Sequence, residues 1–106
     1  MELTFNKYQE GALETWTGED KLLRTILGIC GEAGEVAEAM KKYLRGDYSK
    51  EVLTEMLKKE LGDVLYYIGV CAHEFGIKLD DIATTNYNKL KSRKERNVIQ
   101  GSGDER

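Results

Sequence analysis

Hydrophobic residues recur every three to four positions along most of the chain, which is the spacing of an α-helix that buries one face. No segment shows the convincing alternation of a half-buried strand, and the chain contains no proline. Capping and turn residues divide the pattern into four segments. The sequence therefore predicts an all-α protein with helices at about 5–16, 20–44, 50–76 and from 80 into the nineties.

Residues that favour helix ends support these boundaries. Thr4 precedes the first helix as an N-cap, Gly46 suits the left-handed position after the second, and Asp80 is the predicted N-cap of the fourth. We predict one domain over residues 1–100, with no internal repeat. Residues 101–106 are small and polar in composition, and we expect them to form a flexible C-terminal tail.

Two acidic side chains fall within the hydrophobic face of the third predicted helix. Residues placed at 100° intervals put Glu60 and Asp63 in the same narrow sector as Met56, Tyr67 and Cys71. Carboxylates avoid such positions unless a partner compensates for their burial. This placement indicates that the two acids bind something.

A second acidic pair lies in the second predicted helix, where Glu32 borders the hydrophobic face and Glu35 lies further round. Helical residues three apart have Cβ atoms roughly 5–6 Å apart, so each pair presents two carboxylates to one side. Four carboxylates converging without a cation would repel one another and mostly protonate. Because Mg²⁺ takes oxygen ligands and keeps waters or substrate phosphates, the pairs predict a magnesium site. The alternative is that these acids are solvated charges beside a core.

Size and composition narrow the class of protein. A chain of 106 residues forms one domain, close to the size at which oligomerisation helps stability. With 33% charged residues and a net charge of −3, nothing suggests a general nucleic-acid binder. Cys30 and Cys71 show no CxxC spacing, and we see neither a signal peptide nor a long apolar run. We therefore expect a cytoplasmic protein with free thiols and no membrane partner.

Glycines inside the predicted helices are costly, by up to about 1 kcal/mol each relative to alanine. They stand at positions 28, 31 and 34 of the second helix and at 62 and 69 of the third. We expect either close approach of two helix backbones or room for a ligand. Tolerated packing glycines are the alternative.

Three stretches together resemble a known family. Gly31-Glu-Ala-Gly-Glu-Val-Ala-Glu38 and Lys59-Glu-Leu-Gly-Asp-Val-Leu-Tyr66 are similar to the paired E-x-x-E and E-x-x-D motifs of the MazG-like nucleoside triphosphate pyrophosphohydrolases. The 24 residues between Glu35 and Glu60 suit that family's helix-loop-helix gap. Asn86-x-x-Lys89-Leu90, followed by Arg93, resembles its subsequent N-x-x-K-L-x-x-R stretch.

The resemblance implies a four-helix bundle-like fold, usually dimeric or tetrameric. It implies cleavage of a nucleoside triphosphate to the monophosphate and pyrophosphate with Mg²⁺, or Mn²⁺ as an alternative ion, in nucleotide house-cleaning. The implied metal ligands and catalytic residues are Glu32, Glu35, Glu60 and Asp63. Glu38 is a further candidate for the general base. The alternative for Glu38 is a surface charge that pairs with Lys41 or Lys42.

Five residues are candidates for binding the substrate. Asn86, Lys89 and Arg93 share one helix face and suit phosphate groups, although a solvated basic helix end would look similar. Tyr67 follows Asp63 by one turn and suits a phosphate oxygen, with a core tyrosine as the alternative. Trp16 suits stacking on a nucleobase or, alternatively, closing a small core.

A hypothesis from another class is also open. The chain would then be a non-catalytic helical interaction module, in which the acids form a leftover or partner-binding surface. Metal dependence discriminates the two, because a genuine site would be stabilised by Mg²⁺.

Overall fold

A computed structural model describes residues 2–106 and confirms the all-α prediction. The described residues form four helices and no strand. The helices are α1 (Phe5–Thr15), α2 (Lys21–Leu44), α3 (Lys50–Glu74) and α4 (Leu79–Glu95). Of the three helix ends predicted from capping or turn residues, those marked by Thr4 and Gly46 are confirmed and the start of α4 is not.

Local sequence sets the start of α1, the end of α2 and the start of α3. The Thr4 side chain caps α1 by accepting a hydrogen bond from the Lys7 amide at 3.1 Å. Ser49 caps α3 in the same way through the Val52 amide. After α2, Gly46 takes a left-handed φ of 91°, which lets the chain turn sharply into α3.

The prediction that Asp80 caps α4 is wrong, because the N-cap is Lys78, which makes no side-chain cap bond. Side chains of α1 satisfy the free amides instead. The amide of Leu79 donates to Gln9 Oε1 and the amide of Asp80 donates to Asn6 Oδ1, both at 3.0 Å. The start of α4 is therefore fixed by tertiary contacts with α1.

Gln9 joins three segments at this corner of the molecule. Its side chain is buried, and its Nε2 also donates to the carbonyl oxygens of Gly69 at 2.9 Å and Ile77 at 3.0 Å. One amide side chain thus uses both its donors and its acceptor to hold α1 against α3 and the start of α4.

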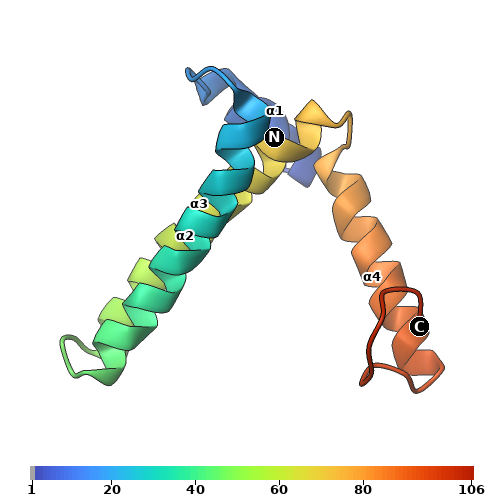
Figure 1. Cartoon of the computed structure of the whole chain (residues 1–106). Coiled ribbons are helices and arrows are strands. Elements are labelled where there is room, and N and C mark those ends of the chain that lie inside the picture. The colour runs from blue at the N-terminus through green and yellow to red at the C-terminus, as the bar shows by residue number, and fades with distance from the viewer. Residues whose placement is uncertain (1) are drawn as a thin grey trace.

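The four helices form two diverging arms (Figure 1). Helices α2 and α3 run antiparallel and pack side by side as one arm. Helix α1 packs against α3 at the base of this arm. Helix α4 touches only α1 and α3, then extends away as the second arm, so no bundle closes within one chain.

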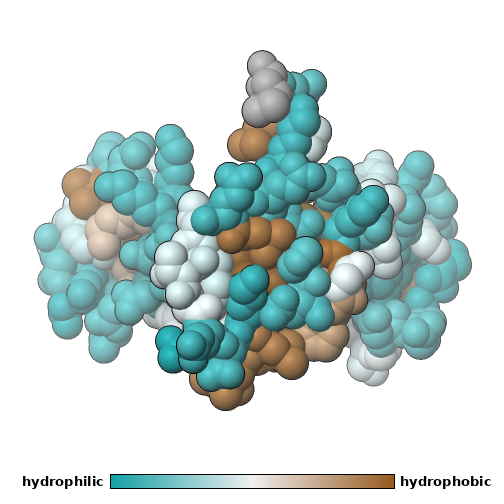
Figure 2. Space-filling view, turned by 90° about the horizontal axis from the view of Figure 1, so that it is seen from above, coloured by the Kyte–Doolittle hydropathy of each residue, from teal (hydrophilic) through white to brown (hydrophobic). Residues whose placement is uncertain are grey.

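This open shape leaves much hydrophobic surface uncovered. The radius of gyration is 16.5 Å, whereas about 13 Å is typical of a compact chain near this length. Leu23 and Leu27 of α2 are each 61% exposed. Figure 2 shows hydrophobic residues gathered at the centre of one face, with polar surface on either side. Over the described residues, no helix combines the length and hydrophobicity needed to cross a membrane.

Candidate active site

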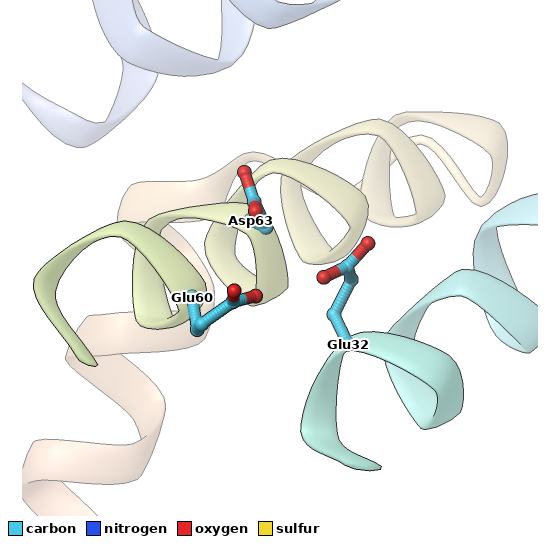
Figure 3. A group of neighbouring side chains, drawn as sticks. All are labelled: Glu32, Glu60 and Asp63. Atoms are coloured by element: carbon cyan, nitrogen blue, oxygen red, sulfur yellow. The ribbon is translucent and has the colours of Figure 1, made fainter. Parts of the chain in front are cut away.

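Three acidic side chains converge between α2 and α3 (Figure 3). Glu32 reaches from α2 toward Glu60 and Asp63 on α3, and one oxygen of each carboxylate lies within 4.8 Å of the others. The i, i+3 spacing puts Glu60 and Asp63 on one side of α3, and the antiparallel packing of α2 brings Glu32 opposite them. Glu32 and Glu60 are half-buried, and Asp63 is exposed.

This acidic group, defined as Glu32, Glu60 and Asp63, holds concentrated negative charge. Partial burial raises the pKa of Glu32, and the charges of Asp63, Glu60 and Glu35 raise it further. None of the ion pairs found among residues 2–106 includes a member of the group. Three carboxylates without a protein counter-charge form an oxygen-only donor set, which fits a hard divalent cation.

The other two predicted acids lie outside this group. Glu35 is exposed, although its charge contributes to the raised pKa of Glu32. Glu38 lies 3.9 Å from the ammonium groups of both Lys41 and Lys42, as its surface-charge alternative predicts. The ligand role of Glu35 and the general-base role of Glu38 stay predictions.

Helix α1 also reaches the part of α3 that carries the acids. The Tyr8 hydroxyl lies 3.5 Å from the carbonyl oxygen of Gly62, between Glu60 and Asp63 in sequence. Burial raises the pKa of Tyr8, and the charge of Asp63 adds to this effect. Sequence analysis did not single out Tyr8, because its neighbour across the helices is distant in the chain.

An aromatic cavity of about 450 Å³ is lined in part by Tyr67, which follows Asp63 by one turn of α3. Trp16 stacks on Tyr66 with ring centroids 6.3 Å apart and meets Tyr67 edge-on at 6.2 Å. The indole N–H of Trp16 donates to the Gly18 carbonyl at 2.7 Å, which fixes the ring. The cavity is lined by Thr15, Trp16, Thr17, Gly18, Arg24, Leu27, Tyr66 and Tyr67. The fold thus brings Trp16 and Tyr67 together, although their spacing in the sequence does not predict this contact.

Gly28 allows α2 to pass the Tyr67 ring. A Cβ atom at Gly28 would lie only 2.4 Å from Tyr67 Cδ1, so any larger residue would displace the ring or the helix. At this glycine α2 approaches an aromatic side chain of α3, and not the backbone of that helix as one of the expectations had it. By contrast, a Cβ built at Gly31, Gly34 or Gly62 would meet no described atom within 4 Å apart from its chain neighbours and the nearby backbone of its own helix.

The predicted phosphate-binding residues lie on α4, in the other arm. Asn86 and Lys89 line one shallow cavity of about 380 Å³, and Arg93 is buried further along the helix. No contact joins α2 and α4 among the described residues, and the arms diverge (Figure 1). A single chain therefore does not bring these cations to the acidic group. Lys89 and Arg93 instead contact Asp104, a residue that sequence analysis did not single out.

Residues 21–98 match the MazG nucleotide pyrophosphohydrolase domain. The chain belongs to the MazG family. It is 46% identical over 83 residues to the Gene 37 protein of Mycobacterium phage L5, and the aligned region covers 76% of this chain and 72% of that protein. It is 32% identical over 87 residues to the uncharacterized protein YvdC of Bacillus subtilis, covering 76% of this chain and 81% of that protein. No solved structure matches the chain.

The MazG match includes α2, α3 and α4, and hence both the acidic group and the basic residues of α4. It leaves out α1 and Trp16. The acidic group is therefore part of the shared MazG region, whereas one wall of the aromatic cavity lies outside it.

Proposed function

We propose that this MazG-family chain hydrolyses nucleoside or deoxynucleoside triphosphates to the monophosphate and pyrophosphate, with Mg²⁺ or, alternatively, Mn²⁺. The observation that carries the proposal is the convergence of Glu32, Glu60 and Asp63 without a counter-charge, on two helices that also line an aromatic cavity. The biological role we propose is cytoplasmic house-cleaning of the nucleotide pool.

The acidic group supplies the metal ligands in this proposal. Glu32, Glu60 and Asp63 would hold the cation directly, and Glu35 would act beside them through bound water. When bound, Mg²⁺ would offset the charge of the triphosphate and polarise the reacting phosphate. A carboxylate of the group, or Glu38, would orient the attacking water and accept its proton.

The aromatic cavity supplies a site for the nucleobase. Its volume falls in the range of about 300–1,000 Å³ that is usual for small-molecule sites. Trp16 and Tyr66 offer flat faces for stacking, and Arg24 lies in the same wall. Because Tyr67 follows Asp63 by one turn of α3, a nucleotide with its base in the cavity would direct its phosphates toward the acidic group.

We further propose that the active unit is a homodimer or homotetramer in which α4 of one copy completes the site of another. Two observations support this. Asn86, Lys89 and Arg93 lie on an arm that diverges from the acids of the same chain. Large hydrophobic residues along α2, such as Leu23 and Leu27, are exposed and require cover.

The test is product analysis with a panel of ribo- and deoxynucleoside triphosphates, in Mg²⁺ or in chelator, with separation of mono- from diphosphates. We expect monophosphate plus pyrophosphate, formed only with the metal, and a ranking of the bases. Diphosphate plus phosphate would place the cleavage at another bond and refute the proposed reaction. No product from any nucleotide would favour the non-catalytic interaction module, for which the exposed hydrophobic residues are also suited.

A further inference from the structure

The C-terminal segment folds back along α4 and is closed into a loop by its last residue (Figure 1). Arg106 donates hydrogen bonds to the carbonyl oxygens of Val98 at 3.0 Å, Ile99 at 2.8 Å and Gly103 at 2.7 Å. Arg96 in turn donates to the backbone oxygen of Arg106 at 2.7 Å. This loop presents Asp104 to the side of α4.

Asp104 contacts two of the cations that we assign to the substrate phosphates. Its Oδ1 atom accepts from Lys89 Nζ at 2.8 Å and from Arg93 Nη2 at 3.3 Å. Arg93 Nη2 also donates to the backbone oxygen of Asp104. The hydrogen bond from Lys89, together with the charges of Lys89 and Arg93, lowers the pKa of Asp104. Asp104 is therefore an anion held where a phosphate oxygen would be held.

Asp104 does not use all the donors at this position. Arg93 is only 4% exposed, and its Nε–H finds no acceptor among residues 2–106. A buried guanidinium with a free donor is unusual, because such groups are normally satisfied. A phosphate has more oxygen acceptors than one carboxylate and matches the fork of an arginine. The free Nε–H therefore points to an anion other than Asp104 as the better occupant.

We propose that Asp104 is a built-in competitor for the phosphate groups of the substrate, which must leave Lys89 and Arg93 before a triphosphate can use them. The proposal rests on the proposed function, which assigns these two cations to the phosphates. Asp104 and a phosphate group would then compete for the same two cations, Lys89 and Arg93, and only one of them could bind at a time. An anion that binds the cations favours the released segment, and a segment that cannot bind them raises the affinity for the anion.

The test compares Asp104→Asn with Glu105→Gln in the full chain. Both variants remove one negative charge from the same loop, but Glu105 makes none of the side-chain hydrogen bonds or ion pairs of the described residues. Asp104 is 76% exposed at its side chain, so its replacement leaves the core intact. The probe is inorganic pyrophosphate, titrated calorimetrically without metal. We expect several-fold tighter binding by Asp104→Asn and unchanged binding by Glu105→Gln.

Two further measurements separate this proposal from the proposed function and from a merely structural role. In turnover assays, Asp104→Asn should lower KM several-fold at similar kcat, and adding Lys89→Ala should remove its advantage in pyrophosphate affinity. Unchanged or weaker pyrophosphate binding by Asp104→Asn, or equal tightening by Glu105→Gln, would overturn the competitor. Tighter pyrophosphate binding by Asp104→Asn, with no hydrolysis by any variant, would support the competition by Asp104 and refute the proposed enzymatic function.

Discussion

The two arms of this molecule carry complementary chemistry under different constraints. In the α2–α3 arm the helices pack along one another, and this packing places Glu32 opposite Glu60 and Asp63. Helix α4 is held at its start by Gln9 and Asn6 of α1, while the remainder extends away from the other helices. The acids therefore have positions set by their own chain, whereas the cations of α4 do not reach them within that chain.

This difference shows which part of a binding site can be located in the structure of a single chain. Carboxylates that repel one another need firm packing to hold them together before a cation binds. Basic residues on a projecting helix can instead serve a second copy, because symmetry brings the same arm to the neighbour's site. The role proposed for the acids thus depends on helix packing within one chain. The role proposed for the cations of α4 depends on how copies of the chain assemble.

The largest expected effect is at the acidic group. Glu60→Gln should lower turnover below about 1% of wild type, since even residues behind the metal ligands contribute about 10–100-fold. Melting temperature should be retained, because the shape of the side chain is preserved. Glu55→Gln, at an exposed position of the same helix, is the matched control and should stay active. Full activity of Glu60→Gln would remove this residue from the site.

Mixing two inactive variants tests whether α4 serves a second copy. Glu60→Gln loses its acidic group and Lys89→Ala loses its cation, so each alone should have little activity. If each site combines acids of one copy with α4 of another, a re-equilibrated equal mixture should recover about a quarter of wild-type activity, because mixed dimers hold one intact site. No recovery, with mixed dimers verified by mass spectrometry of differently tagged chains, would place both groups of each site on one chain.

Gly28 and Gly31 form a pair that tests the packing of the α2–α3 arm. Gly28→Ala places a methyl group 2.4 Å from the Tyr67 ring and should destabilise the fold by about 1–3 kcal/mol through overpacking. Gly31→Ala meets open space and should stabilise by up to about 1 kcal/mol through helix propensity. Urea unfolding measures both. Equal effects of the two substitutions would contradict the contact between α2 and Tyr67.

The smallest effect concerns pH. Because the pKa of Glu32 is raised in the folded chain, the native state binds its proton more tightly than the unfolded state does. Without metal, stability should therefore fall as pH rises from the ordinary glutamate value through the raised value. Saturating Mg²⁺ should remove this loss, because it favours the charged carboxylates.

The measurement is the urea midpoint against pH, with and without Mg²⁺, in the wild type and in Glu32→Gln. The difference between the two proteins isolates Glu32 from the other carboxylates. If the wild type without metal loses no more stability with rising pH than Glu32→Gln does, the repulsion within the acidic group is too weak to support the proposed site.

The sequence by itself determined the local features of this protein. Helical periodicity and the absence of proline predicted four helices, and Thr4 and Gly46 marked ends that the structure confirms. The acidic spacing placed Glu60 and Asp63 on one side of α3. These features were predictable because they depend on backbone geometry over one or two turns.

Only the tertiary structure decided which distant residues meet. Gln9 and Asn6 look like ordinary polar residues of a helix. Their side chains nevertheless accept from the free amides at the start of α4, in place of the cap predicted at Asp80, because those amides face α1. Trp16 joins Tyr66 and Tyr67 in one cavity, and Asp104 joins Lys89 on α4. Such pairings depend on how helices pack and where loops return, and no periodicity along the chain encodes either.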